Sequence, residues 1–382
     1  MLTRIKSDRL IVGDALFDGY LYLRDGSIAE VSGEQKDADV CYDFTGRYVS
    51  PGWIDIHTHG GGGNHFADSD ADEVLRGCDF HLAHGTTSIL PTVSASTFDS
   101  MMHSLENIKQ AMDSGRAHSH ILGAHLEGPY LSREQCGAQC PDHITPPKKE
   151  QYEQAVEQYG AYIKRWTFAP EHDEGGEFCR YVTSHGILAS VGHSNAIGED
   201  MAKAAESGSK LVTHLYSATS TITRALGYRR LGVIEYTFLN DDMYAEIIAD
   251  GHHLPPELIR LILKIKGRDR VIPCTDSLLV AGSDMTSGIM CGTAFIVEDG
   301  VAKLPDRSAF AGSVATADVL IRVLTQKCGV SVPDAVYMMT QNPTRLLGLK
   351  KGSLQAGFDA DLVVFDDDIN VKAVFVDGEK RI

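Results

Sequence analysis

Short apolar runs alternate with longer amphipathic segments through most of the chain. Runs such as Trp53 to Ile56 and Ile163 to Phe168 have the length and composition of buried strands. The segments between them, such as Ala71 to Ala83 and Phe98 to Met112, look helical and begin after N-capping residues. Eight strands with intervening helices fit between Trp53 and about residue 340. This alternation predicts an α/β fold, a (β/α)8 barrel of the TIM type.

The remaining elements complete the pattern. Further strands are expected at Ser88 to Val93, Ile121 to Leu126, Ile187 to Val191, Leu211 to Thr213, Tyr244 to Ala249 and Val271 to Thr275. Further helices are expected at Gln151 to Tyr159, Glu174 to Ser184, Gly198 to Glu206, Thr316 to Lys327 and Asp334 to Thr340, with another that begins at Pro255-Pro256. Residues 288–304 are expected to form a hairpin inserted after the eighth strand, with Asp299-Gly300 at its tip.

Both ends of the chain are rich in strand patterns. These are Leu21 to Arg24 and Ile28 to Val31, joined by the turn Asp25-Gly26, then Tyr48 to Ser50, and near the other end Asp361 to Phe365 and Val371 to Val376. The simplest arrangement is one small β-sandwich domain formed by residues 1–50 and 346–382 together. Residues 51–345 then form the barrel domain.

Composition narrows the class of protein. The chain has 382 residues, 43% of them hydrophobic and 23% charged, which is typical of a globular protein with a large core. The net charge of −17 disfavours nucleic acid or an anionic membrane as a partner. No apolar run has the length of a membrane span, and no secretory pattern opens the chain. Eight cysteines are too sparse for a disulfide framework, so we expect a cytoplasmic protein with reduced thiols.

Histidine and carboxylate residues follow several of the predicted strands. His57 and His59 end the first strand two positions apart, so both imidazoles leave one face of it. Barrel enzymes build their active sites at the C-terminal ends of the strands. The candidates at that end are His57, His59, Glu127, His193, His214 and Asp276. Each alone has an ordinary structural explanation, but together at one end of one barrel they indicate a shared site.

The donor types of these six residues suit a divalent metal such as Zn²⁺ or Fe²⁺. Two metals are sterically possible, one held by His57, His59 and Asp276 and the other by His193 and His214, with Glu127 between them. His125 shares a strand face with Glu127 and is expected either beside the ligands or in the core. His253, just past the seventh strand, is placed where it could contact a substrate. We therefore predict one or two divalent ions per subunit.

Short motifs surround the candidate ligands. They are His57-Thr58-His59-Gly60, His125-Leu126-Glu127-Gly128-Pro129, Gly192-His193-Ser194-Asn195-Ala196, Thr213-His214-Leu215-Tyr216, Ala249-Asp250-Gly251-x-His253 and Thr275-Asp276. Over essentially the whole chain, these motifs and the closing segment from Gly352 to Val363 resemble the N-acetylglucosamine-6-phosphate deacetylase family of the amidohydrolase superfamily.

The resemblance implies a reaction and a partner. Family members are metal-dependent barrel hydrolases that convert N-acetyl-D-glucosamine 6-phosphate to glucosamine 6-phosphate and acetate, so a small-molecule amino sugar phosphate is the implied partner. A metal-activated water would attack the acetamide carbonyl. Asp276, which matches the family's general acid/base, would pass the water's proton to the departing amine.

The resemblance also implies roles for single residues. Glu127, His193 and His214 match the core metal ligands, and His57 and His59 match the additional pair of two-metal members. The residues that match substrate contacts are Ala138, Gln139, Ser217, Ala218, Arg229, Phe310, Ala311 and Gly312, with Arg229 aligned to a phosphate-binding arginine. In the family this arginine often reaches the neighbouring subunit's site, so a homodimer is implied.

Two departures from the family pattern concern sugar and phosphate recognition. Ser217 stands where asparagine is common, and extra residues precede Arg229, so Arg224 and Arg230 are alternatives for the phosphate contact. A deacetylase of N-acetylgalactosamine 6-phosphate or of another acetamido sugar therefore stays open. A third alternative is a cyclic-amide or amine hydrolase of the same superfamily. Many of those use a carboxylated lysine on the fourth strand, but Lys164 lies at the start of that strand, the wrong end. A non-catalytic barrel would have lost ligands, and none of the six is missing.

Overall fold

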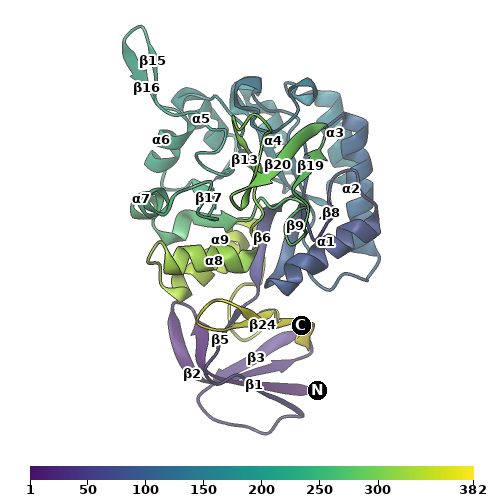
Figure 1. Cartoon of the computed structure of the whole chain (residues 1–382), viewed down its shortest axis with the longest axis vertical. Helices are drawn as coiled ribbons and strands as arrows, with labels where there is room; N and C mark the ends of the chain where they lie inside the picture. Colours follow the sequence, from purple (N-terminus) through teal and green to yellow (C-terminus); the bar gives the residue numbers. More distant parts are fainter.

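The computed structural model describes residues 1–382 and contains a nearly closed barrel of eight parallel strands surrounded by helices (Figure 1). The barrel strands are β6 (Trp53–Thr58), β9 (Thr86–Ser94), β11 (Ala124–Glu127), β12 (Ile163–Phe168), β13 (Leu188–Val191), β14 (Leu211–Val212), β17 (Tyr244–Ile248) and β18 (Val271–Cys274). Neighbours in the sheet follow this order, and β6 pairs with β9. The predicted (β/α)8 barrel is confirmed.

Backbone hydrogen bonds just beyond the strand ends join the first strand to the last. The amide of Asp276 donates to the carbonyl of His57 at 2.9 Å, and the amide of His59 donates to the carbonyl of Ser277 at 2.8 Å. These two bonds lie at the C-terminal ends of β6 and β18, so the closure itself brings three candidate ligands together.

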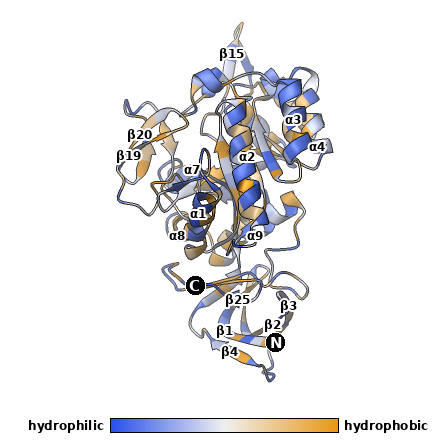
Figure 2. Cartoon of the chain, turned by 90° about the vertical axis from the view of Figure 1, so that its right-hand side faces the viewer, coloured by the Kyte–Doolittle hydropathy of each residue, from blue (hydrophilic) through white to orange (hydrophobic).

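Helices cover the outside of the barrel. They are α1 (Ala71–Ala83), α2 (Phe98–Asp113), α3 (Lys149–Tyr159), α4 (Glu177–Ser184), α5 (Gly198–Glu206), α6 (Val233–Leu239), α7 (Pro256–Lys266), α8 (Ala317–Gln326) and α9 (Val332–Leu347). Their outward faces are mostly hydrophilic (Figure 2), while their inner faces contribute to a core of 58 buried residues. Asp70 caps α1 through a capping box with Glu73, and Thr97 caps α2, which explains why both starts are legible in the sequence.

The two chain ends form a single mixed sheet below the barrel (Figure 1). Its strands are β1 (Leu2–Val12), β2 (Ala15–Arg24), β3 (Ser27–Ser32), β4 (Val40–Asp43), β5 (Tyr48–Pro51), β23 (Leu362–Phe365), β24 (Val371–Val376) and β25 (Glu379–Lys380). The N-terminal strand β5 pairs with the C-terminal strand β23, and residues from both ends share a separate core of 12 buried residues. The β-structure expected from both termini is confirmed as one continuous mixed sheet.

Three segments differ from the expected elements. The third predicted strand is interrupted at Leu122 and Gly123, which separate β10 (His120–Ile121) from β11. The inserted hairpin is a four-stranded sheet of β19 (Ser287–Met290), β20 (Thr293–Glu298), β21 (Val301–Lys303) and β22 (Phe310–Gly312), with the predicted tip Asp299-Gly300 between β20 and β21. A short hairpin of β15 (Thr223–Ala225) and β16 (Tyr228–Arg230), and helix α6 after it, were not predicted.

Two further expectations concern cysteines and membranes. All eight cysteines are free thiols, as expected. No helix combines the length and apolar composition that crossing a bilayer requires.

Candidate active site and metal centre

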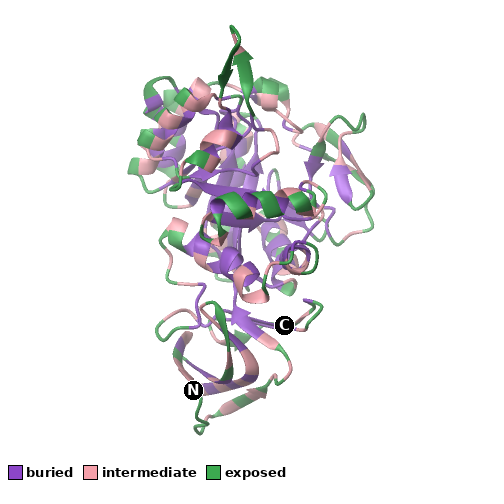
Figure 3. Ribbon diagram, turned by 90° about the vertical axis from the view of Figure 1, so that its left-hand side faces the viewer, coloured by how far each residue is buried: buried purple, intermediate pink, exposed green.

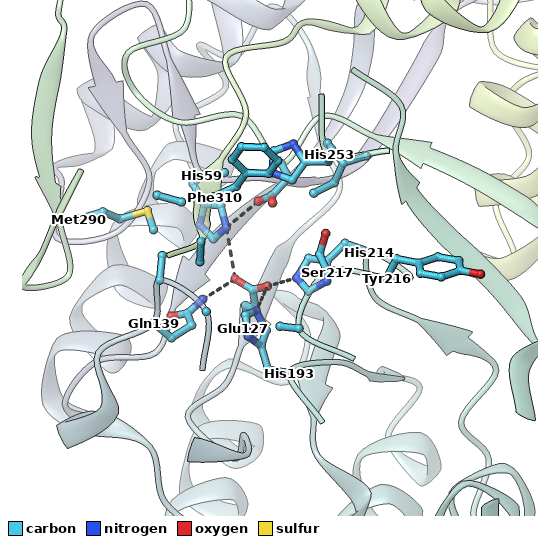
Figure 4. Close-up of a pocket in the computed structure, with 18 residues that line it drawn as sticks. His59, Glu127, Gln139, His193, His214, Tyr216, Ser217, His253, Met290 and Phe310 are labelled. Atoms are coloured by element: carbon cyan, nitrogen blue, oxygen red, sulfur yellow. Dashed lines mark hydrogen bonds and ion pairs between the residues drawn. The ribbon is translucent and has the colours of Figure 1, made fainter. Parts of the chain in front are cut away.

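A cavity of roughly 230 Å³ opens at the C-terminal ends of the barrel strands (Figure 4). Five of the six predicted metal ligands line it, and His57 lies fully buried beneath them. All but one of the residues predicted to contact substrate also line it, namely Ala138, Gln139, Ser217, Ala218, His253, Phe310, Ala311 and Gly312. Arg229 is the exception. Lys164 lies in a separate hollow with Leu122 and Leu188, at the starts of the strands, as expected.

Each candidate ligand is delivered by the end of a strand. His57 and Glu127 are strand residues, whereas His193, His214 and Asp276 lie two residues past their strands. These last three have φ angles of 47°, 29° and 48°, in the left-handed region that residues other than glycine seldom adopt. Such backbone conformations cost about 1–3 kcal/mol each and cluster at functional sites. Here they coincide with side chains that face the cavity.

The Glu127 carboxylate lies at the centre of the histidine cluster (Figure 4). Its Oε1 atom is 3.1 Å from Nε2 of His193, 3.0 Å from Nε2 of His214 and 3.4 Å from Nε2 of His57. Its Oε2 atom is 3.2 Å from Nε2 of His59. Nε2 of His59 is also 3.2 Å from Oδ1 of Asp276. The six predicted ligands therefore form one cluster.

The other ring nitrogens show which atoms face the centre. Nδ1 of His57 is 2.9 Å from the Glu246 carboxylate, and Nδ1 of His193 is 2.9 Å from the carbonyl oxygen of Gln135. Because both partners are acceptors, each Nδ1 carries a proton, and Nε2 is the nitrogen of each ring that faces the carboxylate oxygens. Imidazole nitrogens and carboxylates that meet in a buried cluster are a donor set that fits a divalent metal.

The imidazoles and carboxylates of the cluster shift one another's pKa values. Burial lowers the pKa of His57, but the carboxylates of Glu127, Asp276 and Glu246 outweigh it and raise the pKa to about 10. Burial raises the pKa of Glu127 and of Asp276, while the neighbouring imidazoles, His57 first, hold both below the ordinary carboxyl range. The site thus holds an excess of acceptors that a proton or a metal cation would balance.

Among the six predicted ligands, two overlapping groups have ligand atoms close enough to share an ion. One is His57, His59 and Asp276, and the other is His57, Glu127 and His214, each with its ligand atoms within 4.8 Å of one another. These buried clusters are consistent with a divalent metal site, and imidazole with carboxylate is a donor set that zinc and ferrous iron accept. His125 is not in either group. Its ring bonds to Thr92 and Thr167 and packs edge-on against His57.

The cavity wall contains groups tied to specific partners. The Gln139 side chain donates to Oε2 of Glu127 at 2.7 Å and accepts from the amide of Ala95 at 3.0 Å, so it holds the central carboxylate from the cavity side. Nδ1 of His253 is 2.8 Å from the Asp250 carboxylate, and its ring packs against Phe310. The His253 imidazole is therefore fixed in orientation at the edge of the cavity.

Several site residues were not found from the sequence. Tyr216, Ile248 and Met290 line the cavity as well. Beneath the ligands, the buried ion pair between Arg165 and Glu246 contacts His57. The available signal was a charged residue inside each of two short strand patterns, Arg165 in β12 and Glu246 in β17.

Arg229 lies outside the cavity. The β15–β16 hairpin that carries Arg224, Arg229 and Arg230 projects from the top of the barrel and is almost entirely exposed (Figures 1 and 3). Leu226 and Tyr228 on the same hairpin are 99% and 78% exposed. An exposed apolar tip next to arginines is unusual for a surface with no partner.

Comparison with known proteins assigns the chain to a family. The Amidohydrolase family model matches residues 48–381. The chain is 31% identical to the N-acetylglucosamine-6-phosphate deacetylase of Bacillus subtilis (strain 168), over 94% of this chain and 91% of that protein. It is 31% identical to an N-acetylgalactosamine-6-phosphate deacetylase of a Shewanella species, over 88% of this chain and 84% of that protein.

A solved structure agrees with the sequence relatives. The N-acetyl-D-glucosamine-6-phosphate deacetylase from Mycobacterium smegmatis, solved as a mutant in complex with N-acetyl-D-glucosamine-6-phosphate, superposes with a TM-score of 0.92. It is 28% identical to this chain, and the match covers 99% of both chains. The chain therefore belongs to the amidohydrolase family, on the branch that contains the N-acetylglucosamine-6-phosphate deacetylases.

Proposed function

We propose that this protein hydrolyses the acetamide of N-acetyl-D-glucosamine 6-phosphate to give glucosamine 6-phosphate and acetate. The observation that carries the proposal is the single buried cluster of four histidines and two carboxylates that opens into a cavity at the C-terminal end of a barrel. Relatives along nearly the whole chain bear the name of this activity.

The six clustered residues are the proposed metal ligands. His57, His59 and Asp276 form one group and His57, Glu127 and His214 form the other, with His193 3.1 Å from Glu127, which allows one or two Zn²⁺ or Fe²⁺ ions. When bound, such an ion lowers the pKa of water toward neutrality and polarises an amide carbonyl. Full activity of protein stripped of metal would contradict this part of the proposal.

Asp276 is the proposed general acid and base. It lines the cavity, and its pKa is held low by the nearby imidazoles in spite of its burial, so it is ionised at neutral pH. An ionised carboxylate can accept the proton of the attacking water and then donate it to the nitrogen of the departing amine. No serine or cysteine nucleophile is needed for these reaction steps.

The cavity wall is the proposed sugar site. Ala138, Ser217 and Ala218 line one part of it, and Phe310 with His253 lines another. Gln139 is tied to Glu127 and Ala95, so we assign it to holding the metal ligand as well as to the substrate contact that the family pattern implies.

We further propose that the arginine hairpin acts in a second copy of the chain. The hairpin stands away from its own cavity, and its exposed Leu226 and Tyr228 are suited to burial against another subunit. Arg229, or its neighbours Arg224 and Arg230, would then reach the partner's cavity and bind the 6-phosphate. A homodimer with arginines exchanged between subunits follows from this arrangement.

Subunit mixing tests the exchange directly. Arg229→Ala protein and Asp276→Asn protein should each be weakly active, but a mixed dimer would contain one site with both an intact aspartate and a donated arginine. Activity should therefore rise when the two variants are unfolded, mixed and refolded together. No gain over the separate proteins, with mixed dimers verified by differential tagging, would contradict donation between subunits.

A second substrate is supported by one observation. A relative that covers most of the chain at the same identity is an N-acetylgalactosamine-6-phosphate deacetylase. Acetate release should be measured with both sugar epimers, each with and without the 6-phosphate, before and after metal removal. A preference for the glucosamine phosphate supports the proposal, a preference for the galactosamine phosphate supports the alternative, and no release from any of the four contradicts both.

A further inference from the structure

A buried ion pair spans the barrel interior directly beneath the proposed metal ligands. Arg165 on β12 and Glu246 on β17 are both fully buried, and two guanidinium nitrogens contact the two carboxylate oxygens. Barrel interiors are normally filled with branched apolar side chains. A buried pair is expensive to desolvate and is often no more stable than apolar residues of the same volume, so stability alone does not explain it.

Arg165 is fixed by a complete set of acceptors. Its Nε donates to Oγ of Ser190 at 3.0 Å, one Nη donates to the carbonyl of Ile56 at 3.1 Å, and the other donates to Oγ1 of Thr213 at 2.9 Å. With the two bonds to Glu246, all five N–H groups of the guanidinium are used. Ile56 and Thr213 directly precede His57 and His214, so the network reaches the backbone of two ligands.

Glu246 connects this network to the metal cluster. Its Oε1 atom accepts from the Arg165 guanidinium at 3.0 Å and from the backbone amide of His214 at 3.2 Å, and it lies 2.9 Å from Nδ1 of His57. Every neighbour of this oxygen is a donor or is placed to be one. A carboxylate held by a guanidinium has no proton to offer, so the ring nitrogen of His57 must donate.

The geometry of His57 then follows from Glu246. With the proton on Nδ1, the lone pair of Nε2 faces the cluster, 3.4 Å from Glu127 and 3.4 Å from Asp276. If Glu246 were absent, the proton could move to Nε2, and the imidazole would no longer be a ligand. A carboxylate behind a ligating histidine fixes the tautomer and raises the basicity of the ring.

We propose that Arg165 and Glu246 are positioning residues that set the metal affinity of the site by fixing the His57 tautomer and the His214 backbone. The inference rests on the proposed metal centre and deepens it. Arg165 orients and charges the carboxylate, Glu246 orients the imidazole, and neither needs to touch metal or substrate.

The test measures metal affinity in two variants. Glu246→Gln retains the shape of the side chain but weakens the pair with Arg165, whereas the double variant Arg165→Met/Glu246→Leu replaces the pair by apolar residues that a barrel interior tolerates. Zn²⁺ affinity is measured by competition with a chromogenic chelator, and folding by circular dichroism and Tm. Both variants should fold and bind Zn²⁺ about 10- to 100-fold more weakly. Activity lost at limiting Zn²⁺ should return as Zn²⁺ is raised.

Lys351→Met is the matched control. Lys351 is a largely buried cation that pairs with Asp359 and Asp361 in the terminal sheet, so its loss should lower Tm without changing Zn²⁺ affinity. Folded Glu246 variants with wild-type Zn²⁺ affinity would overturn the positioning role while leaving the proposed function intact. Wild-type protein that binds no divalent metal would overturn the metal centre together with this role.

Discussion

Burial and the neighbouring imidazoles have opposite effects on the pKa of Asp276. Asp276 is only 8% exposed, yet it lines the cavity and is kept ionised by the imidazoles of His57 and His59. A buried carboxylate held in this state can serve both as a metal ligand and as a proton carrier. Substitution by asparagine separates the two roles, because the asparagine side chain can still coordinate a metal weakly but cannot accept a proton.

We predict that Asp276→Asn retains the fold and most of its metal but loses turnover by about 10²–10⁴-fold, the usual contribution of a general acid or base. Steady-state kinetics and metal analysis on the same preparation measure the loss of turnover and the retained metal. Asp173→Asn is the control, because Asp173 is a buried carboxylate that caps α4 through the amides of Phe178 and Cys179. A near-normal kcat for Asp276→Asn would refute the assignment.

At the scale of single residues, the sequence predicts the metal ligands better than the residues that hold the ligands in place. His57, His193 and Asp276 are legible because strand ends in a barrel converge at one face, so order along the chain is enough. Arg165 and Glu246 lie in strand interiors, where a single charge gives no sign of its partner 81 residues away. Their pairing depends on which strands face each other across the barrel, and that is a property of the closed fold.

Among the elements, the β15–β16 hairpin is the least packed against the rest of the chain. Its strands pair only with each other, and its tip residue Leu226 is 99% exposed. Three-residue strands with exposed charged residues have neither the length nor the alternation that marks a strand in a sequence. The arginines themselves were found from the sequence, but not the projecting element that places them outside their own cavity.

We predict that Arg229→Ala lowers kcat/KM for the phosphorylated sugar about 10- to 150-fold and hardly affects the unphosphorylated sugar. A charge-assisted contact is typically worth about 1.5–3 kcal/mol, and only the phosphorylated substrate can make it. Arg224→Ala and Arg230→Ala identify the arginine that matters.

Arg260→Ala supplies the background for this comparison, since Arg260 is an exposed arginine on α7 with only a local partner, Glu257. Equal losses on both sugars would indicate a folding defect. No loss from any of the three hairpin arginines would mean that the 6-phosphate is bound elsewhere.

At the scale of the whole molecule, the barrel and the terminal sheet meet across a seam that is partly apolar and partly charged. The larger core belongs to the barrel but includes Ile11, Val363 and Phe365 of the terminal sheet, which also has a smaller core of its own. Both cores could be predicted from the alternation of strands and helices, because the hydrophobic pattern of each strand predicts how far it is buried. The seam between them could not, since it joins residues more than 200 positions apart.

His120 lies in the charged part of this seam. It begins β10 at the base of the barrel, and its Nε2 atom is 3.3 Å from both Asp361 and Asp377 of the terminal sheet. Lys351 also pairs with Asp361, at 2.7 Å. Burial lowers the pKa of His120 and Lys351 opposes its charge, but the bond to Asp361 together with the negative charges of Asp361 and Asp377 outweighs both and raises the pKa above the ordinary value of 6.5.

The sign of the resulting pH dependence follows from linkage. A histidine whose pKa is higher in the folded state stabilises the fold fully below its unfolded pKa, and this contribution is lost as the pH rises through the folded value. We therefore predict that His120→Gln lowers Tm most below about pH 6.5, and that the difference from wild type shrinks as the solution becomes alkaline.

Metal binding also depends on pH, but that contribution cancels when variant and wild type are compared at the same metal loading. His118→Gln, at an exposed histidine that pairs with Asp79 within the barrel, is the control. A Tm difference that is constant or grows with pH would show that His120 does not join the two cores through its charge.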